Sequence, residues 1–178
     1  MTNAKAPVKV KPIFGALYKD PAVFAQIMQR IENHFGAADY FSPEHSFSET
    51  EYYRDEMGAD LIRRYFSLQR LIYPDALVHM KHLSNQWEEE FSVDGNRAIN
   101  LDPGYIHGAK LVLASCKNFS HRVYLGRGIY GEVTMRFENN EFTRLPWTYQ
   151  DYWNHRDDLH SIRNILIRQI KEPTECEP

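Results

Sequence analysis

Residues 120–136 read SHRVYLGRGIYGEVTMR, in which polar and apolar side chains alternate on both sides of a glycine-flanked loop. A three-residue loop at 126–128 predicts a hairpin that places Arg122 opposite Glu132. One face then carries Arg122, Tyr124, Tyr130, Glu132, Thr134 and Arg136. The other carries His121, Val123, Leu125, Ile129, Val133, Met135 and Phe137. Because a slip of one residue would mix the two faces, burial of the apolar face specifies this register.

Three helices are predicted outside the hairpin. Asp20 and Pro21 are typical of a helix start, and Gly36 is typical of its end. A second helix is predicted to begin at Pro74 and Asp75, because apolar residues follow at helical spacing. The first helix is predicted over 20–36, the second over 74–91 and the third over 157–171.

Short apolar runs between these helices predict strands. They lie at 12–18, 38–47, 63–72 and 96–101. The last of these is predicted to stop at Asp102, Pro103 and Gly104, the residue order of a tight turn. Residues 106–117 suit either a strand or a helix. A turn at 139–140 is predicted to bring Phe142 beside Phe137.

This order of elements predicts an α+β fold, with a mostly antiparallel sheet and helices packed on one face. Its first part fits a ferredoxin-like βαββαβ unit, which a C-terminal β-meander extends. The 178 residues suit one domain, which we expect over 12–171. Residues 1–11 are expected to form a flexible arm and residues 172–178 a flexible tail.

Composition narrows the class of protein. The net charge of -3 predicts no general attraction to nucleic acid or anionic lipid. Cys116 and Cys176 are poorly placed to pair, which predicts reduced thiols and a cytoplasmic setting. The N-terminal lysines have no apolar run behind them, and no segment is long enough to span a bilayer. We therefore expect a soluble protein.

The polar face of the hairpin is the first candidate site. Tyr124 and Tyr130 could stack a planar ring while Arg122 holds an anionic group and Glu132 acts as acid, base or acceptor. The alternative is a solvent-facing surface on which Arg122 and Glu132 form an ordinary cross-strand pair.

Two further segments carry candidate residues. Asp102 could serve as a general base, a metal ligand or an acceptor for a ligand hydroxyl, with Tyr105 and Lys110 contacting the ligand. Its alternative role is to accept N–H bonds within its own turn. The acidic loop 45–58 could hold a hard cation, although a solvated charged loop is the more common outcome. Within it, Glu56 is a candidate catalytic residue that could act as acid, base or metal ligand.

Metal and nucleotide motifs are missing from the chain. His79 and His82 lie three residues apart on a predicted helix, but off its apolar stripe, so surface histidines are expected there and no metal ligand is assigned. The sequence has no Walker phosphate loop, no G-x-G-x-x-G in the turn that immediately follows the first strand, and no G-x-S-x-G, H-E-x-x-H or paired C-x-x-C. The common hydrolase, zincin and zinc-ribbon classes are therefore excluded.

Four segments in order resemble a bacterial family known as domain of unknown function four-four-one-six. They are TEYYRDEMG, NLDPGY, HRVYLGRGIYGEVT and LPWTYQDY. The resemblance runs from Lys11 to about Tyr152 and implies a bacterial cytosolic protein with no assigned activity. Some members carry the label GTP-binding, whereas the Walker loop and the N-K-x-D motif of ordinary GTPases are absent from this sequence. A nucleotide would need another kind of site.

The leading hypothesis is a polar pocket that binds a phosphorylated or nucleotide-like small molecule, with catalysis and any cofactor left open. It requires the three candidate segments to converge. A second hypothesis is RNA or single-strand binding on the exposed tyrosines. A third is a structural or partner-binding module anchored by the aromatic run at 147–153. The oligomeric state is not predicted.

Overall fold

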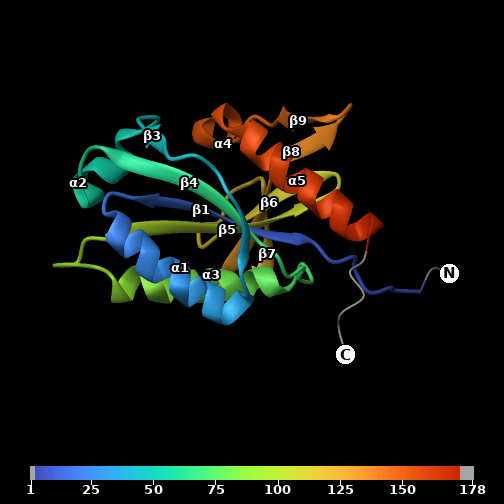
Figure 1. Ribbon diagram of the computed structural model, residues 1–178, viewed down its shortest axis with the longest axis horizontal. Coiled ribbons are helices and arrows are strands. Elements are labelled where there is room, and N and C mark those ends of the chain that lie inside the picture. Colours follow the sequence, from blue (N-terminus) through green and yellow to red (C-terminus); the bar gives the residue numbers. More distant parts are fainter. Residues whose placement is uncertain (1–2, 173–178) are drawn as a thin grey trace.

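One antiparallel sheet runs through the computed structural model, which describes residues 3–172 (Figure 1). Its order is β2-β4-β1-β5-β6-β8-β7, with β3 also on β4 and β9 also on β8. The strands are β1 (Lys11–Tyr18), β2 (Ala38–Phe41), β3 (His45–Phe47), β4 (Leu61–Leu68), β5 (Ile99–His107), β6 (Lys110–Ser115), β7 (Arg122–Gly126), β8 (Ile129–Glu138) and β9 (Glu141–Arg144). The helices are α1 (Pro21–Phe35), the single turn η1 (Glu51–Tyr53), α2 (Arg54–Met57), α3 (Ala76–Glu90), α4 (Gln150–Asn154) and α5 (Arg156–Lys171).

The α+β class and the mostly antiparallel sheet are confirmed. The strand order β2-β4-β1-β5, with α1 and α3 as the connecting helices, is that of a ferredoxin-like unit. Helix α1 begins and ends as predicted, because the Asp20 carboxylate accepts a hydrogen bond from the Ala22 N–H and Gly36 takes a positive φ of 95°. The meander β6-β8-β7 then widens the sheet, and the predicted pairing of Phe137 with Phe142 is confirmed.

The helices cover both faces of the sheet, not one as predicted. Helices α1 and α3 lie on one side in Figure 1, and α4 and α5 lie on the other. Residues of both parities on β1 are buried: Phe14 packs in the α1 and α3 core, and Ile13 packs in the α5 core. A strand buried on both faces is continuously apolar rather than alternating, as PIFGALY is.

The hairpin has the predicted register, with Arg122 opposite Glu132, but a tighter loop. Arg127 and Gly128 alone form the turn, with φ of 52° and 79°, and Leu125 bulges out of the β7–β8 pairing. Strand β7 is the edge of the sheet. The predicted burial of its apolar side chains is therefore wrong, since Val123 is 69% exposed and Leu125 is 42% exposed.

A bulge at Thr134 also corrects the predicted faces of β8. Leu111 pairs with Met135 and Val112 pairs with Val133, so Thr134 is the extra residue. Met135 consequently joins the α5 core, whereas Val133 packs on the α3 side. The predicted single apolar stripe is split between the two faces.

The predicted turn at Asp102, Pro103 and Gly104 is wrong, because all three lie within β5. Pro103 has no N–H to donate, and it lies just before the start of the β5–β6 pairing at Gly104. Gly104 serves close packing: a Cβ there would come within 2.5 Å of the Val112 carbonyl oxygen. The ambiguous segment 106–117 is the end of β5 followed by strand β6.

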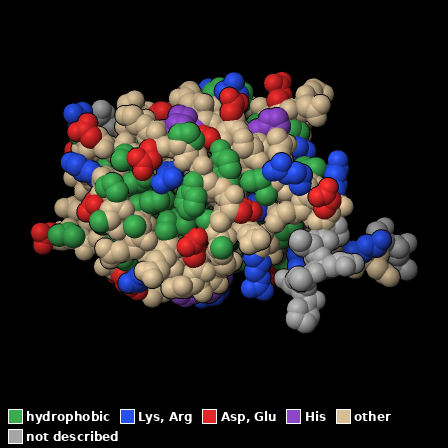
Figure 2. Space-filling model, viewed as in Figure 1, with side chains coloured by type: hydrophobic (Ala, Val, Ile, Leu, Met, Phe, Trp, Pro, Cys, Tyr) green, Lys and Arg blue, Asp and Glu red, His purple; other side chains and the backbone are tan. Residues whose placement is uncertain are grey.

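The chain ends and the surface complete the description. The predicted N-terminal arm is shorter in the structure, since Val10 pairs with Ile72 and Lys11 begins β1. Most of the predicted tail, including Cys176, lies outside the described residues. Within residues 3–172, no helix is both long and apolar enough to cross a bilayer. On the face shown in Figure 2, acidic and basic side chains are interspersed.

Replacing Gly104 with alanine should destabilise the protein by about 1–3 kcal/mol, because the added methyl group collides with the β6 backbone and Leu113. Gly108→Ala is the matched control, since a Cβ at Gly108 meets nothing within 4 Å, and it should change stability by less than about 0.5 kcal/mol. Urea unfolding of the two variants measures the difference. Equal stabilities would contradict this role of Gly104.

Candidate functional site

Two adjoining cavities, of about 290 and 520 Å³, lie where β5 and β6 part. The β5–β6 pairing covers only Gly104 to His107 on β5, and residues 99–103 pair with β1 alone. Both cavities are lined by Asp102, Arg122, Glu132, Lys117 and three tyrosines at positions 52, 53 and 149. The structure thus brings together the β5 segment, the hairpin and the 45–58 segment.

Side chains of helix α3 bond the backbone N–H and C=O groups of β5 that lose a partner where β5 and β6 separate. The Leu101 N–H donates to Glu88 Oε1 at 2.7 Å, and the Leu101 carbonyl accepts from Lys81 Nζ at 3.0 Å. Both side chains are buried and border the smaller cavity. Burial raises the pKa of Glu88, and the nearby Lys81 opposes that rise.

A buried arginine joins two carboxylates beneath the larger cavity. Arg63 donates through one terminal nitrogen to Asp102 at 3.0 Å and through the other to Asp151 at 2.8 Å. Gly15 makes room for this network, because a Cβ there would lie 2.3 Å from the Tyr152 hydroxyl. Burial raises the pKa of Asp151, and the Arg63 charge opposes the rise. The side chain of Asp102 is 26% exposed and that of Asp151 is 7% exposed, so Asp102 is the more accessible of the two carboxylates.

The hairpin supplies a second buried pair. Arg122 Nε donates to Glu132 Oε2 at 2.8 Å, and the same carboxylate oxygen lies 2.9 Å from His121 Nε2. The terminal nitrogens of Arg122 donate to the Ser115 hydroxyl, the Lys117 carbonyl and the Tyr149 hydroxyl. Burial, reinforced by Glu132, raises the pKa of Tyr149 to about 12. Glu132 is 2% exposed, so this pair is a wall of the site rather than a solvated surface pair.

A third arginine bridges the acidic loop to the sheet. Arg97 holds both oxygens of Glu56 at 2.7 Å and donates to Asn100 Oδ1 at 2.8 Å. Its contact with Glu88 Oε2 is longer, at 3.3 Å. The hydrogen bonds from Arg97 lower the pKa of Glu56. Glu56 does not line either cavity and instead positions Arg97, which does.

Three buried donor groups beside the cavities have no hydrogen-bond partner within the described chain. They are Arg63 Nε, Asn100 Nδ2 and the Tyr152 hydroxyl. The Asn100 amide orientation is set by the bond from Arg97 to its oxygen, which leaves the NH₂ group unpaired. An unpaired buried donor is costly, so these groups require an acceptor such as water or a ligand oxygen.

The remaining predicted residues lie away from the cavities. Tyr124 and Tyr130 pack on each other on the edge hairpin, with ring centroids 5.2 Å apart, and neither lines a cavity. Tyr105 packs on the α3 side of the sheet. Lys110 begins β6, opposite Arg136.

Several residues of the site were missed from the sequence. Arg63, Arg97, Lys117 and Asp151 all border the cavities, but none of them was predicted as a site residue. Asp151 lies within the segment LPWTYQDY, to which only a family resemblance was attached. A signal was available for Arg63: consecutive residues of a strand face opposite sides, so one of Arg63 and Arg64 had to point into a covered face. No comparable signal marks Asp151, which contacts Arg63 only in the folded chain.

Comparison with known proteins gives a family match and no function. A family model described as Domain of unknown function (DUF4416) matches residues 8–165. No curated protein and no solved structure matches the chain.

The pair of Glu56 with Arg97 predicts a pH dependence of stability. The folded-state pKa of Glu56 is lowered, so ionised Glu56 contributes to the free energy of unfolding. This contribution is present above the unfolded-state pKa of about 4.3 and is lost as the pH falls through the folded-state pKa. Glu56→Gln should therefore be less stable than wild type at pH 7, by about 1 kcal/mol for a partly exposed pair, and the gap should close below about pH 4. Thermal unfolding of both proteins from pH 3 to 7 tests this, and a gap that is constant with pH would contradict it.

Proposed function

The chain belongs to the DUF4416 family, and we propose that it binds a phosphorylated or nucleotide-like small molecule in the two adjoining cavities. Their volumes, about 290 and 520 Å³, suit a ligand of that size. The larger cavity is bordered by aromatic rings, among them Phe47, Phe119 and Trp147. Such walls favour a planar ring.

The unpaired donors carry the proposal. Arg63 Nε, Asn100 Nδ2 and the Tyr152 hydroxyl all present N–H or O–H groups without acceptors. Lys117 adds an exposed ammonium group, which within residues 3–172 hydrogen-bonds only the Tyr52 hydroxyl, at 3.1 Å. A ligand rich in oxygen acceptors, such as a phosphate ester with a carbonyl-bearing ring, supplies what these groups lack.

Asp102 is the residue to which we assign contact with a ligand hydroxyl, or the role of general base if a reaction occurs. Its carboxylate is more exposed than those of Asp151, Glu132 and Glu88. Arg122 bonds one oxygen of Glu132 and Arg97 bonds both oxygens of Glu56, so we assign these two carboxylates to positioning the arginines.

The alternative of nucleic-acid binding rests on Tyr124, which is 58% exposed beside Tyr130. The net charge of -3 supplies no general attraction to a phosphate backbone. We therefore favour the small-molecule site.

A thermal-shift screen of nucleotides, sugar phosphates and inorganic phosphate, each beside its unphosphorylated counterpart, tests the proposal. A phosphorylated ring compound present at about 100 times its Kd should stabilise the protein by about 2.7 kcal/mol, or roughly 5–10 °C. Lys117→Ala should weaken the shift, whereas Lys110→Ala, outside the cavities, should leave it unchanged. If no compound in the screen shifts the wild-type protein, the proposal fails. Binding only to single-stranded RNA would instead support the alternative.

Tyr152→Phe separates ligand binding from folding. Because the Tyr152 hydroxyl is buried without a partner, its removal should leave stability equal to that of wild type or raise it by up to about 2 kcal/mol. The affinity for the ligand found in the screen should nevertheless fall, as measured by calorimetry. A variant that loses stability and keeps full affinity would show that the hydroxyl serves the fold alone.

A further inference from the structure

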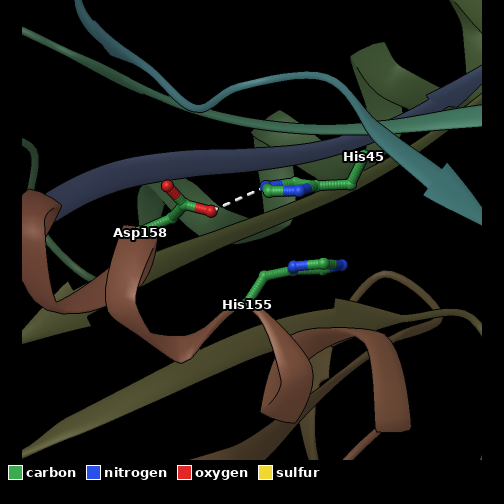
Figure 3. A group of neighbouring side chains, drawn as sticks. All are labelled: His45, His155 and Asp158. Carbon is green, nitrogen blue, oxygen red and sulfur yellow. Dashed lines mark hydrogen bonds and ion pairs between the residues drawn. The ribbon is translucent and has the colours of Figure 1, made fainter.

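Two histidines and an aspartate from distant parts of the chain meet outside the cavities. His45 lies on β3, His155 directly precedes α5, and Asp158 lies in the first turn of α5. Their ligating atoms all lie within 4.8 Å of one another. Figure 3 shows the two imidazoles stacked, with the carboxylate directed at the edge of the His45 ring. The ring centroids are 3.7 Å apart, and His45 Nε2 lies 2.8 Å from Asp158 Oδ2.

The carboxylate of this cluster is held in place from behind. Tyr40 donates its hydroxyl hydrogen to Asp158 Oδ1 at 2.8 Å, which turns Oδ2 toward His45. The Asp158 N–H donates to the His155 carbonyl at 3.1 Å, so one backbone turn at the start of α5 holds both residues. Hydrogen bonds that orient a ligating carboxylate in this way are typical of metal sites.

The nitrogens of the His155 ring are available to bind an ion. The ring stacks on His45 and lies near Tyr65, but its nitrogens make no hydrogen bond within residues 3–172. A tetrahedral ion bound at about 2.0–2.2 Å would need its ligands about 3.4 Å apart, a spacing that rotation of His155 can supply. The ion would take the place of the proton that joins His45 to Asp158. All three residues are partly exposed, so an ion can enter from solvent.

We propose that His45, His155 and Asp158 bind a divalent transition-metal ion of the Zn²⁺ type. Two imidazole nitrogens and one carboxylate oxygen suit Zn²⁺, whereas Mg²⁺ and Ca²⁺ prefer oxygen ligands alone. Three protein ligands leave one tetrahedral position open to water or another ligand. None of the three residues lines either cavity, so this proposal does not depend on the proposed function.

Titration of the full-length protein with Zn²⁺ in a calorimeter tests the site. Wild type should bind one ion per chain, and His155→Ala should bind at least tenfold more weakly. His82→Ala is the control, because His82 lies on α3, on the opposite side of the sheet from α5, and hydrogen-bonds the Arg127 carbonyl, so it should not change the affinity. Circular dichroism verifies the fold of each variant. Equal affinity of wild type and His155→Ala, or an equal loss in both histidine variants, would overturn the proposal.

Two further variants guard against a folding defect in His155→Ala. Asp158→Asn keeps the shape of the side chain and should also weaken Zn²⁺ binding at least tenfold. Tyr40→Phe removes only the orienting hydrogen bond and should weaken binding by about tenfold or more, without abolishing it. Co²⁺ should give a visible absorption band in wild type that is lost in His155→Ala. Unchanged Zn²⁺ affinity in Asp158→Asn would overturn the assignment of that ligand and with it the three-residue site.

Discussion

The backbone of Leu101 has no partner strand on its β6 side, and the site depends on how that deficit is met. A buried N–H or C=O that lacks a partner costs free energy comparable to a lost hydrogen bond. Glu88 and Lys81 of α3 supply the partners, so β5 and β6 can separate without loss of the local structure. The two cavities lie at this separation.

Three arginines then fix the walls around that opening. Arg63 joins Asp102 to Asp151, Arg97 joins Glu56 to Asn100, and Arg122 joins Glu132 to Tyr149. Removal of one partner from a buried ion pair costs about 3–5 kcal/mol, because the other charge stays buried and unpaired. The charged groups therefore hold their positions as a network, and the donors that remain unpaired belong to residues that line the cavities.

Local chemistry explains the parts of the fold that could be predicted. Asp20 and Gly36 set the two ends of α1 through contacts within a few residues. The alternation of polar and apolar side chains in the hairpin sets Arg122 opposite Glu132. The order of helices and strands likewise predicts the ferredoxin-like unit. The turn predicted around Pro103 was wrong, because the same residues that favour a turn also fit a strand that is unpaired on one side.

The sequence by itself determined most of the helices and strands, the pairing of Arg122 with Glu132, and the candidate residues Asp102, Arg122 and Glu132, since each follows from neighbours along the chain. Only the tertiary structure decided that these three meet, that helices cover both faces, and that Arg63 reaches Asp151. It also decided that His45 lies beside Asp158, 113 residues further along. Periodicity describes which side of its own element a residue faces. The partner on that side depends on how the sheet and helices pack.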